Sequence, residues 1–468
     1  MAEVIRTISP ATQQVVAEVQ GTSLKEASQI VQASQDAFLG WKRVPLAERT
    51  SIIRKGLGLI QQRKEQLGYE LTTQMGRPVA YSGKEIETMG KRADYLFRTA
   101  EEALREIPGE QEAGFRRWVK KEPVGPTLVV FAWNFPYLIL VNALVPALLS
   151  GNSVLLKPSP QVPLVGERIA DIFHEAGLPD GVLQVIQSGD PQTLNELVKL
   201  PGLGLVTFTG STSVGLALRE ATASRIVPLN LELGGNDPAY VRPDADVKYV
   251  AAQLVDGAVF NSGQSCCAVE RVYAHDDIHD ALVQALQEEL RSYKLGNPFD
   301  LSTNVGPVIS AAAKRSIQAQ IDDALSKGAV DVTPPNPTFQ SLPKTDAGNY
   351  VAPVILTNVS HDMLVMQEET FGPVIPVARV TSDDEAIAYM NDSTYGLTAS
   401  VWTQDIARGE EIMEQLEAGT VFINRCDYPS PDLAWTGWKN SGLGCTLGPK
   451  AFDAFYKLKS YHIKESQG

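Results

Sequence analysis

Two short segments of this chain carry side chains that could together perform covalent catalysis. Residues 231–235 read Leu-Glu-Leu-Gly-Gly, and residues 260–266 read Phe-Asn-Ser-Gly-Gln-Ser-Cys. A thiol can attack an electrophilic carbon and hold it as a thioester, and a carboxylate can deprotonate the water that releases it. Cys266 is therefore a candidate nucleophile, and Glu232 is a candidate general base.

Each of these residues also has an ordinary structural explanation. A buried cysteine usually packs as a small apolar side chain, and a glutamate at a strand end is often a surface charge. Leu231 and Leu233 favour a pocket around Glu232, where loss of water would raise the pKa of the carboxyl group. Cys267 follows directly, but adjacent side chains point in different directions, so we expect it to pack or to be a redox-sensitive neighbour.

The elements that position these residues follow an alternating pattern from residue 127 onward. Buried apolar runs alternate with helical stretches and short loops, which predicts a parallel sheet covered on both faces. The expected strands are 127–131, 153–157, 182–186, 205–208 and 226–231, and the expected helices include 137–149 and 163–176.

Helices are predicted on both sides of this region. Ser23 and Glu26 have the spacing of a capping box, which starts a helix. Two more helices are expected at 46–66 and 83–104, and a second α/β region after residue 235 has helices near 246–261 and 278–293. Prolines make 332–337 a surface loop.

Composition narrows the class of protein. The 468 residues carry a formal net charge of −14, which argues against nucleic acid as a partner. The four cysteines form no disulfide pattern, so a reducing compartment, the cytoplasm, is expected. The beginning of the chain lacks the pattern of a signal peptide, and no apolar run is long enough to span a membrane. No motif indicates a metal site.

Both reactive segments resemble those of the NAD(P)-dependent aldehyde dehydrogenase superfamily, and the resemblance extends from about residue 8 to 463. Further similar motifs are Trp-Asn-Phe-Pro at 133–136, Lys-Pro-Ser-Pro at 157–160, Phe-Thr-Gly-Ser at 208–211, Glu-Glu-Thr-Phe-Gly-Pro-Val at 368–374 and, in part, Lys-Asn-Ser-Gly-Leu-Gly at 439–444.

The fold class that this resemblance implies is α/β: two α/β domains with parallel sheets and a small β oligomerisation flap. The implied cofactor domain is 1–104 and 124–235, and the catalytic domain is 236–440. The flap and C-terminal segment are 105–123 and 441–468, with strands near Phe115–Pro123 and 457–463.

The resemblance also implies roles for individual residues. Asn134, which could otherwise be only a helix cap, would form an oxyanion hole with the backbone N–H of Cys266. The implied cofactor residues are Trp133, Lys157, Ser159, Pro160, Gly189, Gly210, Ser211, Gly215, Leu233, Glu369 and Phe371. The substrate pocket would be lined by Phe135, Leu138, Asn142, Pro429 and Trp435, which suggests an apolar or aromatic aldehyde.

The chain departs from the family pattern at 434–437, where Ala-Trp-Thr-Gly replaces Pro-Phe-Gly-Gly, and at Cys445, and three further departures bear on function. Thr446 stands where a supporting carboxylate is usual, which bears on how protons move near Glu232. Asn142 stands where members acting on succinic semialdehyde commonly carry an arginine, so an ω-carboxylated aldehyde is less expected. Pro160 stands where many NAD-preferring members have a glutamate that would repel a 2′-phosphate. The last change predicts that NADP is used.

The leading functional hypothesis is oxidation of an aldehyde to its acid through a cysteine thioester, with NADP or NAD as the hydride acceptor. A CoA-acylating dehydrogenase, a succinate-semialdehyde-type dehydrogenase, a cysteine hydrolase and a non-catalytic structural protein are the alternatives. Exposed strand edges in the flap predict a homodimer or homotetramer. The expected partners are a small-molecule aldehyde and other subunits, with no nucleic acid and no membrane.

Overall fold

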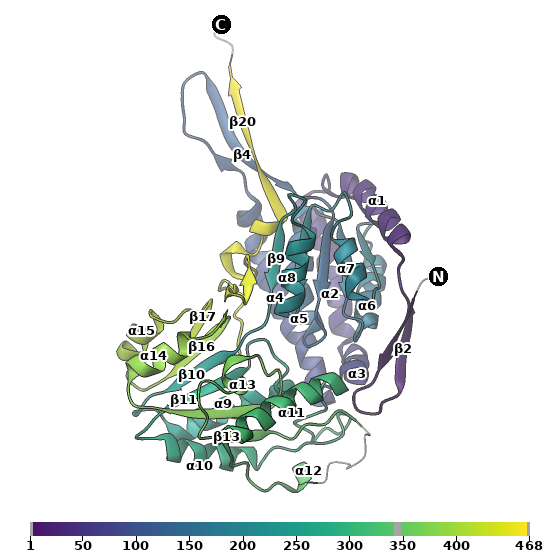
Figure 1. The fold of residues 1–468 in the computed structure, drawn as a ribbon. Coiled ribbons are helices and arrows are strands. Elements are labelled where there is room, and N and C mark those ends of the chain that lie inside the picture. Colours follow the sequence, from purple (N-terminus) through teal and green to yellow (C-terminus); the bar gives the residue numbers. More distant parts are fainter. Residues whose placement is uncertain (1–2, 341–347, 466–468) are drawn as a thin grey trace.

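Two large sheets and a projecting flap make up the chain in the computed structural model, which describes residues 3–340 and 348–465 (Figure 1). The first sheet has the order β19-β9-β8-β5-β6-β7. Its strands are β5 (Thr127–Phe131), β6 (Val154–Pro158), β7 (Leu183–Val185), β8 (Leu205–Thr209), β9 (Leu229–Glu232) and β19 (Gly442–Leu443). Strands β5 to β9 are parallel, and β19 pairs antiparallel with β9.

Helices cover both faces of the first sheet, as the alternating pattern predicts. The helices are α1 (Leu24–Trp41), α2 (Leu46–Gln62), α3 (Lys64–Met75), α4 (Val79–Leu104), α5 (Pro136–Ser150), α6 (Pro163–Glu175), α7 (Pro191–Leu197) and α8 (Thr212–Ala221). Alternate residues of β5 enter two separate cores: Val129 packs with α2 to α6, and Leu128 packs with α1, α7 and α8. The capping box at Ser23 is confirmed.

The expected single helix over 46–66 is wrong in one respect. Helix α2 ends at Gln62 and α3 begins at Lys64. Arg63 between them has ψ of 11°, outside the helical range, so the chain turns there. The apolar spacing continues through the break, which is why the sequence pattern does not reveal it.

The second sheet has the order β12-β13-β14-β11-β10-β16-β17 and is parallel apart from β12. Its strands are β10 (Asp237–Val241), β11 (Val269–His275), β12 (Val330–Asp331), β13 (Val354–Thr357), β14 (Val374–Val380), β16 (Thr398–Trp402) and β17 (Thr420–Ile423). Its helices are α9 (Val247–Val259), α10 (His279–Leu290), α11 (Ala311–Ser326), α12 (Pro337–Gln340), α13 (Leu364–Gln367), α14 (Asp383–Asn391) and α15 (Ile406–Met413). Two cores again form, with Ala239 and Val241 facing α9 and α10 and Tyr240 on the opposite face.

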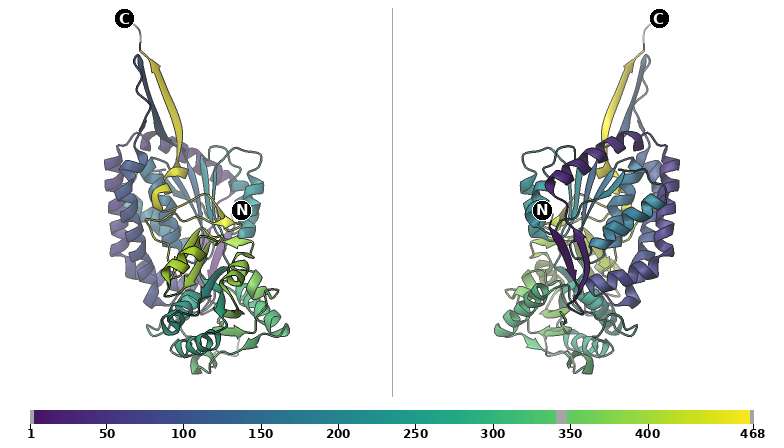
Figure 2. Two further views of the ribbon diagram at one scale, coloured as in Figure 1. Left: turned by 90° about the vertical axis from the view of Figure 1, so that its left-hand side faces the viewer. Right: turned by 90° about the vertical axis from the view of Figure 1, so that its right-hand side faces the viewer.

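The flap is a three-stranded antiparallel sheet of order β20-β4-β3 that projects away from both large sheets (Figure 2). Its strands are β3 (Ile107–Pro108), β4 (Phe115–Pro123) and β20 (Tyr456–Lys464). Trp118 stacks on Tyr461 with ring centroids 4.6 Å apart, which holds the two long strands together. The flap strands therefore match the predicted ranges closely.

Short elements complete the chain. They are the hairpin β1 (Val4–Ile8) and β2 (Val15–Gln20), the pair β15 (Tyr395–Gly396) and β18 (Trp438–Lys439), and the 3₁₀ turns η1 (Phe260–Gly263), η2 (Gly448–Lys450) and η3 (Asp453–Phe455). Within the described part of the chain, no helix is long and apolar enough to cross a bilayer.

Candidate active site

The strand order of the first sheet brings two candidate residues, Asn134 and Glu232, to one edge together with Thr209. The chain order of the strands reverses between β5 and β8, and in open α/β sheets ligands bind beyond the carboxyl ends of the strands at such a point. Asn134 follows β5, Thr209 ends β8 and Glu232 ends β9. The Glu232 carboxylate and the Asn134 amide, 98 positions apart in the chain, therefore lie at the same edge of the sheet.

The candidate nucleophile follows a backbone turn of unusual conformation. Asn261, Ser262 and Gly263 all have positive φ angles, of 53°, 60° and 73°. Such a run is held only when the surroundings fix it. The Ser262 hydroxyl donates to the carbonyl of Gly306 at 2.9 Å, and Gln264 accepts from the Ile309 N–H at 2.7 Å. The turn therefore presents Cys266 from a rigid loop.

Two cavities meet at the candidate catalytic residues. One has a volume of about 430 Å³ and the other about 250 Å³, and Asn134, Thr209, Glu232 and Cys266 line both. The larger cavity contains every predicted substrate residue: Phe135, Leu138, Asn142, Pro429 and Trp435. The smaller contains six of the predicted cofactor residues: Trp133, Gly210, Ser211, Leu233, Glu369 and Phe371. A molecule in each cavity would meet at Cys266.

The five other predicted cofactor residues lie outside the smaller cavity. Lys157 is buried at the end of β6, and its amine has no ion pair or hydrogen bond with a described residue. Burial lowers the pKa of this amine to about 8. Ser159 donates its backbone N–H to Phe131, and the Pro160 carbonyl accepts from the Thr7 hydroxyl at 3.0 Å. Gly189 lies beside the N-terminal hairpin, near Glu3 and Ile5.

The turn into α8 suits an anion such as a pyrophosphate. Ser211 is the N-cap residue and makes no side-chain cap, so first-turn N–H groups remain open to a ligand. A Cβ on Gly215 would lie 2.5 Å from Leu233, so glycine allows α8 to pack against the segment after Glu232. Together with the unpaired Lys157 amine, these features fit the predicted dinucleotide.

The Glu232 side chain is partly exposed and lines both cavities, whose walls are mostly apolar. Burial raises the pKa of its carboxyl group, and a hydrogen bond from the Thr446 hydroxyl and the charge of Arg92 oppose that rise. Thr446 reaches the site because its backbone pairs with Trp435 and because β19 lies beside β9. A carboxylate with a raised pKa suits a general base.

Cys267 occupies a different environment from Cys266. It is 4% exposed, and its thiol donates to Asp427 at 2.9 Å. A hydrogen bond with Cys266, burial and the Asp427 charge raise the pKa of the Cys267 thiol well above its usual value. The thiolate is the reactive form of cysteine, so Cys267 is poorly suited to attack a substrate.

A buried ion pair that sequence reasoning missed supports this rim. Arg77 and Glu85 form a salt bridge with both side chains 1% exposed. Arg77 also donates to the backbone carbonyl of Asn134, while Glu85 accepts the N–H groups of Tyr137 and Leu138 at 2.7 and 3.2 Å. A carboxylate at this position stabilises the N-terminus of α5. The pair thereby fixes the backbone that carries Asn134.

The sequence does contain a signal for these residues. Glu85, Met89, Arg92 and Leu96 have the spacing of one helix face, and all four are buried in α4. Charged residues on the apolar face of an amphipathic helix are rarely buried without a partner. Glu85 and Arg92 could therefore have been recognised as residues that face the site.

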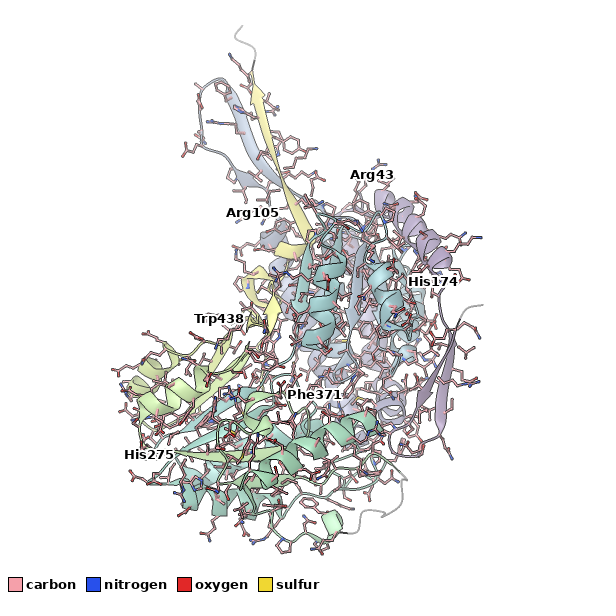
Figure 3. The ribbon with its side chains drawn as sticks, viewed as in Figure 1. Arg43, Arg105, His174, His275, Phe371 and Trp438 are labelled. Carbon is pink, nitrogen blue, oxygen red and sulfur yellow. The ribbon has the colours of Figure 1, made fainter. Side chains whose placement is uncertain are left out.

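Glu369 and Phe371 are positioned by a carboxylate on the second sheet and by the backbone N–H of Gly235. Glu270 on β11 accepts the N–H groups of Thr370 and Phe371, both at 2.8 Å. Glu369 accepts from the Gly235 N–H at 3.1 Å, and burial raises the pKa of Glu369 to about 7. Phe371, labelled in Figure 3 between the two large sheets, meets the Trp133 ring edge-on at 5.7 Å.

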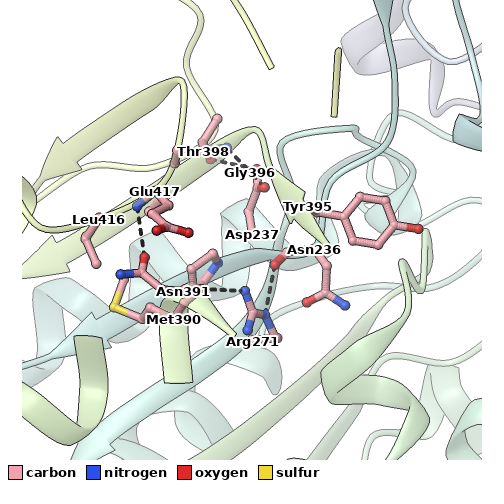
Figure 4. Close-up of a pocket in the computed structure, with 13 residues that line it drawn as sticks. Asn236, Asp237, Arg271, Met390, Asn391, Tyr395, Gly396, Thr398, Leu416 and Glu417 are labelled. Atoms are coloured by element: carbon pink, nitrogen blue, oxygen red, sulfur yellow. Dashed lines mark hydrogen bonds between the residues drawn. The ribbon is translucent and has the colours of Figure 1, made fainter. Parts of the chain in front are cut away.

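A small polar cluster anchors the segment after Glu232 (Figure 4). Asp237 accepts from the hydroxyl and the N–H of Thr398 at 2.7 and 3.1 Å, and Arg271 donates to the Asn236 carbonyl at 2.9 Å. The Asn236 amide donates to the Glu368 carbonyl at 2.7 Å. The cavity between these groups is only about 10 Å³, about the size of one water molecule. The cluster is therefore structural, and it ties Glu369 to the strand that follows Glu232.

The chain is similar to known proteins over nearly its whole length. The model of the aldehyde dehydrogenase family matches residues 1–461. The 3,6-anhydro-alpha-L-galactose dehydrogenase of Streptomyces coelicolor is 32% identical over 463 residues, which are 98% of this chain and 93% of that protein.

Solved structures of similar proteins contain a bound cofactor. Betaine aldehyde dehydrogenase from Staphylococcus aureus in complex with NAD+ has a TM-score of 0.93 at 28% identity, covering 100% of this chain and 93% of that one. NADP-dependent glyceraldehyde-3-phosphate dehydrogenase from Bacillus halodurans C-125, complexed with NADP, has a TM-score of 0.90 at 33% identity, covering 99% and 96%. The chain therefore belongs to the aldehyde dehydrogenase family and is an NAD(P)-dependent enzyme that oxidises an aldehyde.

Proposed function

We propose that this enzyme oxidises its aldehyde to the carboxylic acid through a thioester on Cys266. The observation that carries the proposal is the meeting of two cavities at Asn134, Glu232 and Cys266. The larger cavity would hold the aldehyde, and the smaller would hold the nicotinamide end of the cofactor. The two reactants would then reach Cys266 from opposite sides.

The first step is attack of the Cys266 sulfur, as thiolate, on the aldehyde carbon. The Asn134 side-chain amide and the Cys266 N–H stabilise the negative oxygen that forms. Asn134 at present donates to the Gln264 carbonyl at 3.3 Å, a long hydrogen bond that a substrate oxygen can replace. Arg77 donates to the backbone carbonyl of Asn134, and this contact helps to fix the direction of the Asn134 side-chain amide.

The cofactor, when bound, accepts the hydride that the aldehyde carbon must lose to become a thioester. Lys157, Ser159, Gly210 and Ser211 would hold its polar parts, and Trp133, Leu233 and Phe371 would surround its ring. Glu369 would accept hydrogen bonds from the adjacent ribose. Because Pro160 carries no charge to repel a 2′-phosphate, we propose that NADP is used and that NAD is the weaker cofactor.

The second step is hydrolysis of the thioester. Glu232 removes a proton from water, the water oxygen bonds to the acyl carbon, and the carbon–sulfur bond breaks to release the acid and Cys266. The raised pKa of Glu232 supports this role, since its carboxylate then holds the proton more firmly than a solvated glutamate would.

The alternatives are less well supported. A CoA-acylating enzyme would replace water with a thiol, and it would not need Glu232 in the cavity wall. A cysteine hydrolase would need a histidine beside Cys266, but no histidine is among the described residues that line either cavity. A non-catalytic protein would not need Cys266, Glu232 and Asn134 together at one rim.

Assembly and location complete the proposal. We propose that the flap joins subunits into a homodimer or homotetramer, because β20 is an edge strand with an exposed Leu458. The division into a cofactor domain, a catalytic domain and the flap follows the two sheets and the projecting strands. The four cysteines are free thiols, which supports a cytoplasmic location.

A panel of aldehydes tests the proposed reaction. Each would be incubated with NAD or NADP, with and without CoA, while absorbance of the reduced cofactor and the product are followed. The proposal predicts reduced cofactor and a free carboxylic acid in equal amounts, without any need for CoA. Formation of an acyl-CoA as the only product would contradict the hydrolytic step.

A further inference from the structure

Arg92 introduces a positive charge into the wall of the proposed substrate cavity. It lies on the buried face of α4, is 7% exposed, and lines the same cavity of about 430 Å³ as Cys266 and Glu232. Arg92 belongs to none of the motifs that carry the family resemblance. Its position is unusual, because a buried arginine normally has an acidic partner.

The partners of Arg92 are neutral. Its Nη1 donates to the Leu138 carbonyl at 3.2 Å and to Oδ1 of Asn142 at 3.3 Å. Neither Nε nor Nη2 has a hydrogen-bond partner among residues 3–340 and 348–465, and Nε is fully enclosed. These bonds tie α4 to α5 but give the guanidinium no carboxylate in direct hydrogen-bond contact.

Four acidic residues line the cavity, and within the described residues none of them forms a salt bridge with Arg92: Glu85, Glu232, Asp256 and Asp427. Glu85 is paired with Arg77 and accepts two N–H groups at the start of α5. Glu232 accepts from Thr446 and is needed as a base. Burial lowers the pKa of Arg92, and its interactions with Glu232 and the two cysteines only partly oppose that effect. An anion supplied by a ligand would stabilise this charge.

Nη2 is the donor of Arg92 that a ligand can reach. Nε is enclosed, whereas Nη2 is neither enclosed nor hydrogen-bonded to a described residue, and Arg92 lines the cavity. Nη2 can donate a charge-assisted hydrogen bond to one carboxylate oxygen, and the carboxylate would also offset the charge. A hydroxyl group would accept the hydrogen bond but leave the charge unbalanced. Arg92 therefore matches a carboxylate better than a neutral polar group.

We propose that Arg92 binds a carboxylate on the substrate, so that the enzyme acts on aldehydes that carry a carboxylate group. The inference rests on the proposed function, because it assigns the substrate class of the same cavity. Sequence analysis considered such substrates less expected because position 142 is asparagine. In the structure, however, Asn142 holds a guanidinium that comes from α4, so an arginine is present beside that position.

Matched substrates and variants test this assignment. Succinic semialdehyde carries the carboxylate, its methyl ester has the same chain without the charge, and butanal has neither group. They would be compared with the wild-type enzyme, with Arg92→Met and with Arg92→Lys. Arg98→Met, which removes an exposed arginine from the same helix, is the control.

The wild-type enzyme is expected to have a kcat/KM for succinic semialdehyde at least about 10-fold above that for the ester or butanal. Arg92→Met should lower that value by about 10- to 100-fold, the range for a lost charged hydrogen bond, mainly through KM. Butanal oxidation should fall less than succinic semialdehyde oxidation, since butanal makes no such bond and loses only the effect of the Arg92 charge on Glu232. Arg92→Lys should restore part of the loss, and Arg98→Met should behave as wild type.

Two results would overturn the assignment: a wild-type enzyme without preference for the charged aldehyde, or an equal loss on all three substrates in Arg92→Met. The second would mean that Arg92 only ties α4 to α5.

Calorimetry with succinate provides a readout independent of turnover: wild type should bind succinate and Arg92→Met should not. If no aldehyde is oxidised, the proposed function fails, and succinate binding still decides the role of Arg92. If Arg92→Met does not fold, the wild-type comparison of acid with ester decides it.

Discussion

The Thr446 hydroxyl donates a hydrogen bond to a carboxylate oxygen of Glu232, although the two residues are 214 positions apart in the chain. The hydroxyl occupies the position where the family pattern usually has a carboxylate. A neutral donor lowers the pKa of Glu232, whereas a second negative charge would raise it. The substitution at this position therefore tunes the proposed base toward its ionised form.

Thr446→Val should make Glu232 harder to ionise. Removing a hydrogen bond to a charged group costs about 1.5–3 kcal/mol, equivalent to about one to two pKa units. Since the base must be unprotonated, the acid limb of the kcat profile should move to higher pH by about that amount. Thr446→Ser, which keeps the hydroxyl, should retain the wild-type profile. Superimposable profiles for Thr446→Val and wild type would show that the bond does not tune Glu232.

Pro160→Glu should shift cofactor preference toward NAD. A carboxylate near the 2′-phosphate costs about 1 to 4 kcal/mol at 4 Å, depending on solvent access, and about 1.4 kcal/mol is a factor of ten. The ratio of kcat/KM for NAD to that for NADP should rise about tenfold or more. Pro160→Gln controls for the loss of proline. A wild-type enzyme that reduces NAD but not NADP would contradict the assignment.

Lys157 predicts a pH dependence of NADP binding. Its pKa is lowered to about 8, so the amine is protonated below that pH and loses its charge as the pH rises through it. The dissociation constant for NADP, measured by fluorescence, should therefore increase above pH 8, and that for NAD should increase less. Lys157→Arg keeps its charge and should remove this trend. Equal pH dependence for both cofactors would show that Lys157 does not contact the 2′-phosphate.

The flap predicts how the oligomer can be weakened. Leu458 is 63% exposed on edge strand β20, and burying it against another subunit would be favourable. Leu458→Asp, or removal of residues 457–468, should lower the oligomeric state in light scattering. Leu301→Asp changes a leucine that is 77% exposed far from the flap and should have no effect. An unchanged oligomer in both flap variants would exclude β20 from the interface.

Local patterns were enough to predict most of the first sheet, and local motifs singled out Cys266 and Glu232, which line the same two cavities. The strand at 127–131 and the cap at Ser23 depend on neighbours within a few positions. By contrast, Arg77 meets Asn134 and Arg92 meets Asn142 across 57 and 50 positions. These contacts depend on how α4 and the residues just before it pack against α5 and the residues just before it, which no local spacing encodes. The Thr446 contact depends likewise on β19 joining the sheet beside Glu232.

Trapping the acyl-enzyme tests the central claim most directly. In Glu232→Gln, thioester formation should continue while hydrolysis slows, so reduced cofactor should appear in a burst of about one equivalent per active site. Peptide mass spectrometry after the burst should then find the acyl group on Cys266. The Cys266→Ala variant should show neither the burst nor the adduct. The Cys267→Ala variant should keep most of the activity. An acyl group on Cys267, or wild-type steady-state turnover in Glu232→Gln, would contradict the account.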